Sequence, residues 1–312
     1  MPVSGSVTDF IVSISNVFID DIVTWREEIH LGVTGGAGLH ALAGCRVWTS
    51  HLGIVASVGE DVAPFLPEMH SLGIDTAGLS YQQSRTVRAW QIFQPGDLRV
   101  EVQRDPAVPI AQAVPDFQQL PALYSQAAGY HVLWNGGDEP LLELLREMRR
   151  MNPSAIIVFE PSPEDAHKPP AFFEKIFPFI DGFSPSLSEA QSILHIEEPA
   201  DIIRKFLRLG CRAIALRMGE RGSMGGDESG RMYHVPPAEA CIVDVTGAGN
   251  AYAGGWLCGL VQRRPMPECL AMASVSASFE IEQYGLCRFS DEKVPTRDER
   301  LAQVLSQIKI EG

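Results

Sequence analysis

The chain has 312 residues, of which 45% are hydrophobic and 21% charged, and its formal net charge is −14 at pH 7. This composition is ordinary for a globular protein with a large core, arranged as one α/β domain or as a domain with a small appendage. Because Lys and Arg form no cluster larger than a pair and no apolar run approaches the roughly 20 residues that span a bilayer, neither nucleic acid nor a membrane is expected as a partner.

Strand-like and helix-like segments alternate along most of the chain. The predicted strands are short continuous apolar runs, at residues 10–14, 51–58, 155–159 and 212–218. The predicted helices have small or apolar residues at helical spacing, at residues 36–48, 139–151 and 200–209. Asn152-Pro153 and Gly210 end the last two of these helices. This alternation predicts a doubly wound, mostly parallel sheet with helices on both faces.

Two segments depart from the alternation. Residues 84–105 alternate apolar and polar side chains around Pro95-Gly96-Asp97, as a half-exposed hairpin does. Residues 21–34 resemble extended chain that leaves the first strand and returns. We predict that both are strands of a small lid sheet inserted into a single domain of residues 1–312, the alternative being a plain surface ribbon. A lone ribbon is marginally stable, so the lid should pack on the body or on a second copy, and a homodimer through the lid is expected.

The lid hairpin carries candidates for covering a bound sugar or base. Arg88, Trp90 and Phe93 lie along it, although the alternation alone leaves open which of them face inward.

The cysteines and the first residues bear on the location of the protein. The six cysteines stand far apart, without a C-x-x-C pair or a histidine at metal-ligand spacing, so we expect reduced thiols and no zinc. The first ten residues lack the positive start and apolar stretch of a signal peptide. A cytoplasmic location is therefore expected.

The most specific pattern is the stretch Asp244-Val-Thr-Gly-Ala-Gly-Asn250, followed by small and apolar residues that can open a helix. Gly247 and Gly249 allow a tight turn, which at a helix N-terminus directs free N–H groups and the positive end of the helix dipole toward one point. Such a cradle suits a phosphate or a developing phosphoryl charge. We therefore predict that the backbone of Gly247, Ala248 and Gly249 binds a transferring phosphoryl group.

Five stretches in order resemble the ribokinase-like (PfkB) family of sugar and nucleoside kinases. They are Gly35-Gly36, residues 53–61, residues 72–76, residues 216–223 and the glycine-rich stretch that ends at Asn250. The resemblance covers most of the chain and implies a doubly wound α/β core with a β-lid. It also implies an ATP-dependent, magnesium-requiring phosphotransferase acting on a hydroxymethyl group of a small sugar or nucleoside, with a monovalent cation as a possible further cofactor.

The resemblance also assigns roles to individual residues. The acceptor substrate would contact Asp20, expected at the end of the first strand, together with Gly35, Gly36 and His40. The nucleotide site would include Arg217, Gly219, Gly222, Asp244, Thr246, Ser278 and Gly285. Glu189 would act on magnesium through water, while Asn250 and the backbone of residues 247–249 would form the catalytic turn. Plain structural roles stay open for several of these residues: a strand end for Asp20, a helix first turn for Glu189, a turn cap for Asp244, and helix packing around Ser278 and Gly285.

Four positions depart from the family pattern. The family usually has Asn in place of His40, and its N-x-x-E motif appears here as Ser186-Leu-Ser-Glu189. Arg217-Met218 replaces the Thr that usually precedes the nucleotide-site turn. The usual base, an Asp after Gly-Ala-Gly, is Asn250, as in a divergent fungal-type subgroup that this stretch resembles.

The amide at position 250 bears directly on the chemistry. Asn has no useful basicity, and general-base assistance is worth about 10²–10⁴ in rate, or roughly 3–5 kcal/mol. Phosphoryl transfer depends mostly on positioning and charge stabilisation, so the loss should weaken the reaction rather than abolish it. His40 titrates in a range suited to proton transfer and is a candidate substitute, unless it is simply a packed helix histidine.

Three hypotheses follow. The first is a sugar or nucleoside kinase with unusual base chemistry. The second is a catalytically silent relative that binds nucleotide or sugar in a regulatory role, and the third is a different reaction of the same pocket on a ribosyl or phosphorylated substrate. The sequence does not identify the acceptor.

Overall fold

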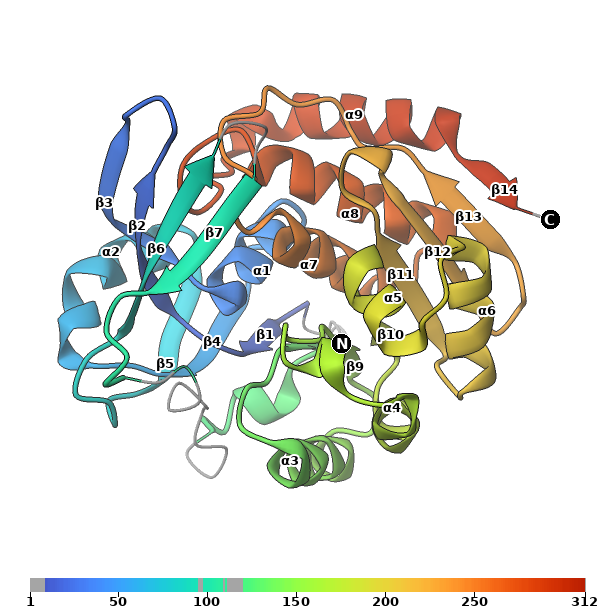
Figure 1. Cartoon of the computed structure of the whole chain (residues 1–312), viewed down its shortest axis with the longest axis horizontal. Helices are drawn as coiled ribbons and strands as arrows, with labels where there is room; N and C mark the ends of the chain where they lie inside the picture. Colours follow the sequence, from blue (N-terminus) through green and yellow to red (C-terminus); the bar gives the residue numbers. More distant parts are fainter. Residues whose placement is uncertain (1–8, 95–97, 109, 111–119, 312) are drawn as a thin grey trace, which may run out of the picture.

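The computed structural model describes residues 9–94, 98–108, 110 and 120–311, and these form two sheets (Figure 1). The strands of the large sheet are β1 (Ile11–Ile14), β4 (Leu52–Ser57), β5 (Ile74–Ser80), β8 (Gly129–Val132), β9 (Ile156–Phe159), β10 (Gly182–Phe183), β11 (Ala213–Arg217), β12 (Ser223–Asp227), β13 (Met232–Val235) and β14 (Lys309–Glu311). Their order is β14-β13-β12-β11-β10-β9-β8-β1-β4-β5. Pairs from β11 to β5 are parallel, and pairs from β11 to β14 are antiparallel.

Helices cover both faces of this sheet. They are α1 (Ala37–Arg46), α2 (Leu66–Ser71), α3 (Asp138–Met151), α4 (Pro170–Ile176), α5 (Leu187–Leu194), α6 (Pro199–Arg208), α7 (Ala248–Val261), α8 (Met266–Glu280) and α9 (Val294–Gln307). Figure 1 shows α8 and α9 on one side of the sheet and α3 and α4 on the other. None of the helices within the described residues is long and apolar enough to cross a membrane.

Two hydrophobic cores arise because successive strand residues point to opposite faces. In β11, Ala213 and Ala215 belong to the core with α1, α7, α8 and α9, whereas Ile214 and Leu216 belong to the core with α3 to α6. The small alanines let the helix layer of α1, α7, α8 and α9 approach the sheet closely. The core with α3 to α6 is filled by large side chains such as Phe173. The predicted fold class, a doubly wound α/β sheet with a small separate sheet, is confirmed.

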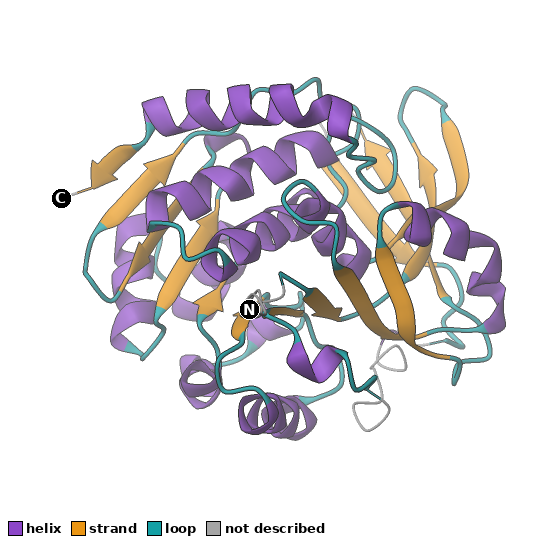
Figure 2. Ribbon diagram, turned by 180° about the vertical axis from the view of Figure 1, so that it is seen from behind, coloured by secondary structure: helices purple, strands orange, loops and turns teal. Residues whose placement is uncertain are grey.

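Helices α1, α7 and α8 pack backbone against backbone, and Figure 2 shows them together over the sheet. A Cβ on Gly44 would lie 2.1 Å from the carbonyl oxygen of Ala251, and one on Gly254 would lie 2.0 Å from that of Ala41. Any side chain at these glycines would therefore push the helices apart. This contact fixes the position of the N-terminus of α7.

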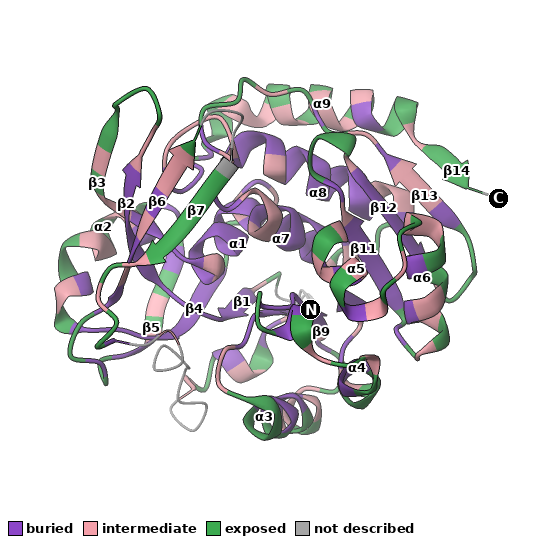
Figure 3. Cartoon of the chain, viewed as in Figure 1, coloured by how far each residue is buried: buried purple, intermediate pink, exposed green. Residues whose placement is uncertain are grey.

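The second sheet is the lid. Its strands are β2 (Phe18–Val23), β3 (Ile29–Gly35), β6 (Val87–Gln94) and β7 (Leu98–Gln103), in the order β3-β2-β6-β7. In Figure 3, β7 is largely exposed whereas β2 is mostly buried. The expected hairpin turn at residues 95–97 lies outside the described residues.

The lid begins earlier in the chain than the sequence suggested. Strand β1 ends at Ile14, and Asn16 then accepts a hydrogen bond from the Ala37 N–H at 2.8 Å. Strand β2 starts at Phe18 because from there it pairs with both β3 and β6. Asp20 therefore lies inside a lid strand, and its expected place at the end of the first strand was wrong.

Candidate active site

A cleft of about 450 Å³ opens at the carboxyl ends of β1, β8, β9 and β11. Asn16, Leu133 and Glu160 follow the first three of these strands, Arg217 ends the fourth, and all four residues line the cleft. In the sheet, β4 lies on one side of β1 and β8 lies on the other, so the direction in which the chain adds strands reverses at β1. Ligands of open α/β sheets bind at such a reversal.

The N-terminus of α7 points into this cleft. Gly247 caps the helix with a left-handed φ of 75°, and Gly247, Gly249 and Asn250 line the cleft. N–H groups of a first helical turn have no acceptor within their own helix, so those of Gly249 and Asn250 are available. The Ala248 N–H reaches the Val245 carbonyl at 3.3 Å and is partly engaged. The predicted phosphate cradle thus faces a cleft. The N–H groups of Gly249 and Asn250 are more open to a ligand than the N–H group of Ala248.

Both glycines of the turn are needed because side chains press on them. A Cβ on Gly247 would lie 2.2 Å from His40 Nδ1, and one on Gly249 would lie 2.1 Å from Arg217 Nη1. The imidazole and the guanidinium therefore pack directly against the cradle.

His40 forms a buried pair with Glu280, a residue on α8 that sequence reasoning missed. Nδ1 lies 2.5 Å from Glu280 Oε1, both side chains are buried, and Glu280 Oε2 accepts the Cys287 N–H at 3.0 Å. Burial acts to lower the pKa of His40, but the hydrogen bond to Glu280 and the charges of Glu280, Asp20 and Asp244 outweigh it and raise the pKa. Burial raises the pKa of Glu280. Among the described residues, His40 Nε2 has no hydrogen-bond partner.

Asp20 lines the same cleft from the lid. It is 3% exposed, and its Oδ1 accepts a hydrogen bond from Gln91 Nε2 at 3.1 Å. Burial raises the pKa of Asp20 to about 6, although the hydrogen bond from Gln91 and the charge of His40 act against it. A Cβ on Gly35 would lie 2.0 Å from Asp20 Oδ2 and 3.6 Å from His40 Nε2. The carboxylate and the free imidazole nitrogen therefore border the same space.

The neighbouring acid, Asp21, serves the lid instead. It accepts the Gly32 N–H at 2.8 Å and pairs with Arg104, whose guanidinium lies 5.2 Å from the ring centroid of Trp90. Trp90 does not line the cleft. The residues of the lid hairpin that line the cleft are instead Gln91, Arg99 and Glu101, which the sequence did not single out.

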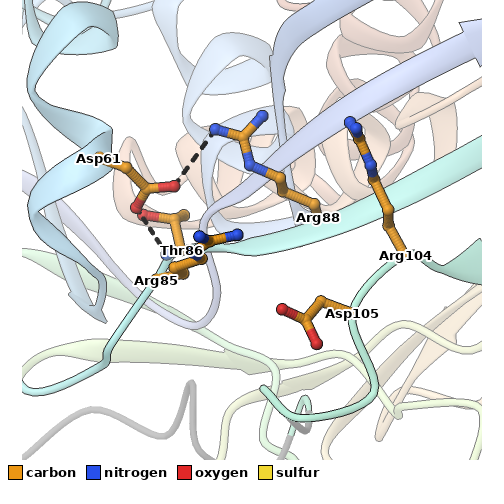
Figure 4. A pocket seen from close by; sticks show the side chains of 6 residues that line it. All are labelled: Asp61, Arg85, Thr86, Arg88, Arg104 and Asp105. Atoms are coloured by element: carbon orange, nitrogen blue, oxygen red, sulfur yellow. Dashed lines mark hydrogen bonds and ion pairs between the residues drawn. The ribbon is translucent and has the colours of Figure 1, made fainter.

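A second cavity, of about 480 Å³, lies at the base of the lid (Figure 4). Asp61 accepts the Thr86 N–H at 2.7 Å and pairs with Arg88 at 3.2 Å, which ties the start of β6 to the body. Burial acts to raise the pKa of Asp61, but the hydrogen bonds from Thr86 and Arg88 outweigh it and lower the pKa. Arg88 is thus part of the lid attachment, and it does not line the active-site cleft.

On the opposite side of the cradle, Glu160 is the centre of a charged network. Its side chain is 2% exposed and lies 2.6 Å from Arg217 Nη1 and 3.0 Å from His131 Nε2. Asn250, which lines the same cleft, also acts to lower the pKa of Glu160. Burial acts to raise the pKa of Glu160, but these partners outweigh it and lower the pKa. The sequence carried one signal for this residue, since Glu160 follows a predicted strand directly.

Glu189 begins α5 in a capping box with Ser186. Its Oε2 accepts the Ser186 N–H at 2.7 Å, its own N–H donates to Ser186 Oγ at 3.2 Å, and Arg217 Nη2 lies 3.4 Å away. No group of three His, Cys, Asp or Glu side chains within the described ranges is placed to hold a metal ion. Mg²⁺, however, is usually held by one or two carboxylates and the nucleotide phosphates. Glu189 fits that mode because its Oε1 has no partner among the described residues.

Asp244 and Thr246 organise the loop that precedes the cradle. Asp244 Oδ1 accepts the Thr246 N–H at 2.8 Å, so it is a turn acid, as the structural alternative predicted. Asp244 Oδ2 and Thr246 Oγ1 are nevertheless buried without a partner in the described part of the chain. Of the two, only Thr246 lines the cleft.

The remaining nucleotide-site candidates lie outside the lining of this cleft. Gly219 and Gly222 form the turn after β11, with φ of 61° and 78°. A Cβ on Gly219 would meet nothing within 4 Å, so this turn is open to a ligand. Ser278 is buried and accepts a hydrogen bond from Arg300 at 3.0 Å, and Gly285 packs against lid strand β3.

Comparison with known proteins agrees with the fold. The sequence pattern of the "pfkB family carbohydrate kinase" matches residues 32–293. Cytidine kinase of Thermococcus kodakarensis is 24% identical over 279 residues, which are 88% of this chain and 97% of that protein. A Burkholderia thailandensis nucleoside kinase solved with inosine has a TM-score of 0.77 at 15% identity, covering 95% of this chain and 99% of that one. A Cryptococcus neoformans ribokinase solved with ADP has a TM-score of 0.73 at 19% identity, covering 95% and 100%.

Proposed function

Since the chain belongs to the pfkB family of carbohydrate kinases, we propose that it transfers the γ-phosphoryl group of ATP to a hydroxymethyl group of a small sugar or nucleoside. One observation carries the proposal: the N-terminus of α7 opens into a cleft whose other wall presents Asp20 and Gln91. A helix N-terminus stabilises phosphoryl charge, and a buried carboxylate beside an amide hydrogen-bonds hydroxyl groups.

In this proposal the acceptor lies between the lid and the cradle. Asp20, Gln91 and Glu101 bind its hydroxyls, with Gly35 and Gly36 leaving room for its ring. The N–H groups of residues 247–249 stabilise the charge on the transferring group, and Asn250 orients the attacking hydroxyl through its amide oxygen.

The nucleotide occupies the side of the cleft near β11 and the turn after it. Arg217 and Thr246 contact its phosphates, Gly219 and Gly222 form the wall of its site, and Ser278 and Gly285 flank its base from a greater distance. Glu189 holds Mg²⁺ through water, and the ion neutralises phosphate charge when bound. Asp244 organises this loop and any monovalent cation near it. The ADP in the similar ribokinase supports a nucleotide in this fold.

A homodimer through the lid belongs to the same proposal. Ile29, Leu31, Val100 and Val102 are large apolar side chains on the lid, each more than 40% exposed. Pairing two lids would remove this surface from water.

The test is an assay of ADP release from ATP and Mg²⁺ with cytidine, inosine and D-ribose as acceptors, using wild type, Asp20→Asn and Asp21→Asn. We expect acceptor-dependent ADP release that Asp20→Asn abolishes and Asp21→Asn reduces only slightly, since Asp21 supports the lid. Asn250→Asp is measured beside them. Thermal stabilisation by ATP without turnover on any acceptor would instead favour the silent, nucleotide-binding protein.

A further inference from the structure

The amide at position 250 leaves the proposed kinase reaction without its usual proton acceptor. Resting on that proposed function, we propose that His40, held by Glu280, is the general base that takes the proton from the acceptor hydroxyl. Glu280 acts through His40 and is a positioning residue.

The imidazole lies where such a base is needed. On one side its ring presses on Gly247, since a Cβ there would lie 2.2 Å from Nδ1 and 2.7 Å from Cε1. On another side, Nε2 shares the space beside Gly35 with the Asp20 carboxylate. His40 lines the cleft. It therefore lies between the phosphoryl cradle and the carboxylate that faces the acceptor.

The two ring nitrogens are clearly distinguished. Nδ1 is taken by Glu280 Oε1 at 2.5 Å, and Nε2 is buried with no partner within the described residues. A buried polar nitrogen without a partner costs free energy in the ligand-free protein, so a ligand hydroxyl that fills the gap is favoured. Because the carboxylate of Glu280 accepts a hydrogen bond from Nδ1–H, the neutral imidazole keeps its lone pair on Nε2.

The proposed step moves one proton and one phosphoryl group. The hydroxyl O–H bond breaks, its proton passes to His40 Nε2, and its electron pair stays on the oxygen that bonds to the γ-phosphorus. The bond from that phosphorus to the bridging oxygen breaks, and ADP leaves with the electron pair. The imidazolium that results is stabilised by Glu280, whose charge is buried beside it.

The charged groups around His40 set the pH at which it acts. Glu280 from α8, Asp20 from β2 and Asp244 from the loop before α7 are all acidic and raise its pKa. The neutral, proton-accepting form therefore becomes populated at a higher pH than in an ordinary histidine. Asp20 is assigned to binding the acceptor hydroxyls in the proposed function, and its Oδ1 accepts a hydrogen bond from Gln91.

The first test is the pH dependence of kcat in wild type, His40→Asn and Glu280→Gln. We expect a wild-type limb that rises above pH about 6.5, and a limb displaced to lower pH in Glu280→Gln, because the charge that raises the pKa is gone. His40→Asn should lose the limb and about 10²–10⁴ in kcat, with ATP affinity unchanged. His51→Asn is the matched control: His51 also pairs with a carboxylate, Asp9 at 2.6 Å, but it is 67% exposed on the surface.

The second test needs no variant to fold. ¹⁵N NMR of the imidazoles in wild type should show His40 protonated at Nδ1, with Nε2 titrating above about 6.5. The opposite tautomer, or a kcat limb that persists in His40→Asn, would overturn the dyad while leaving the kinase function intact. ADP release with none of the acceptors would refute the proposed function itself, and the catalytic role of His40 with it.

Discussion

The contact between Gly247 and His40 makes Gly247→Ala the most informative perturbation of the cradle. Gly247 has a φ of 75°, which an alanine adopts at a cost. The new Cβ would also overlap the imidazole ring, lying 2.2 Å from Nδ1 and 2.3 Å from Cγ. The ring cannot retreat freely because Glu280 holds it from behind at 2.5 Å.

The two effects have separable magnitudes. A left-handed conformation costs an L-residue roughly 1–2 kcal/mol. Replacing glycine also restricts the unfolded chain, which stabilises the folded protein by about 0.4–1 kcal/mol, so the net backbone cost is about 1 kcal/mol. Overpacking against a fixed ring adds roughly 1–3 kcal/mol. Gly247→Ala should therefore lower the free energy of unfolding by about 2–4 kcal/mol. Displacement of the cradle donors should also reduce kcat by about 10²–10³.

Gly230→Ala is the matched control for the backbone cost. Gly230 has a φ of 77°, and a Cβ there would meet nothing within 4 Å. Urea unfolding should give a loss of about 1 kcal/mol for Gly230→Ala, and Gly247→Ala in a His40→Ala background should cost no more than that. Equal losses for the two single glycine variants would show that the imidazole does not press on the cradle, and the reasoning about this contact would fail.

Three further predictions concern charged side chains. Arg217→Met leaves the Glu160 carboxylate without its arginine and should lower the free energy of unfolding in urea by about 3–5 kcal/mol at neutral pH. The control is Arg212→Met, at a half-exposed arginine, which should lower it by less than about 1 kcal/mol. Equal losses would contradict the charged network around Glu160. Asp61→Asn should lower the free energy of unfolding by about 1 kcal/mol and speed hydrogen exchange of the Thr86 amide. Because the pKa of Asp61 is lowered in the folded protein, the stability that Asp61 contributes to the wild type should be lost as the pH falls below about 4. Asp20→Asn should stabilise the ligand-free protein by about 1–3 kcal/mol near pH 8 and little near pH 4. The pKa of Asp20 is raised to about 6 in the folded protein, so the wild-type protein loses stability as the pH rises from about 4 through 6. A destabilised Asp20→Asn protein at pH 8 would refute this prediction.

The sequence predicted the fold better than it predicted the site, and the reason is the range of the interactions. Hydrophobic periodicity is local, so segments such as residues 139–151 and 155–159 match α3 and β9 within one residue. The short strand β10 has only two residues and gave no periodic signal. Asp20 was assigned to the wrong element because the turn after β1 depends on a hydrogen bond between Asn16 and Ala37, which only the folded chain forms.

The partners of the site residues lie far apart in sequence. His40 and Glu280 are 240 positions apart, and the sequence around Glu280 did not indicate a role for its side chain. Arg217 was visible as a departure from the family pattern, but its ion pairs with Glu160 and Glu189 were not. Glycine spacing, by contrast, is local, which is why the turn at residues 247–249 and the helix after it could be predicted from the sequence.

Asn250 and His40 can be understood together through the two acids beside them. The side chain of Asn250 acts to lower the pKa of Glu160, a buried carboxylate paired with Arg217 and His131. An aspartate at position 250 would place two carboxylates together, and one of them would have to hold a proton. Repulsion from Glu160 therefore disfavours the usual base on this side of the cradle. On the other side, where a histidine replaces the family's asparagine, Glu280 supports a nitrogen that can accept the proton. The same cradle is retained, and its proton acceptor has moved from one wall of the cleft to the other.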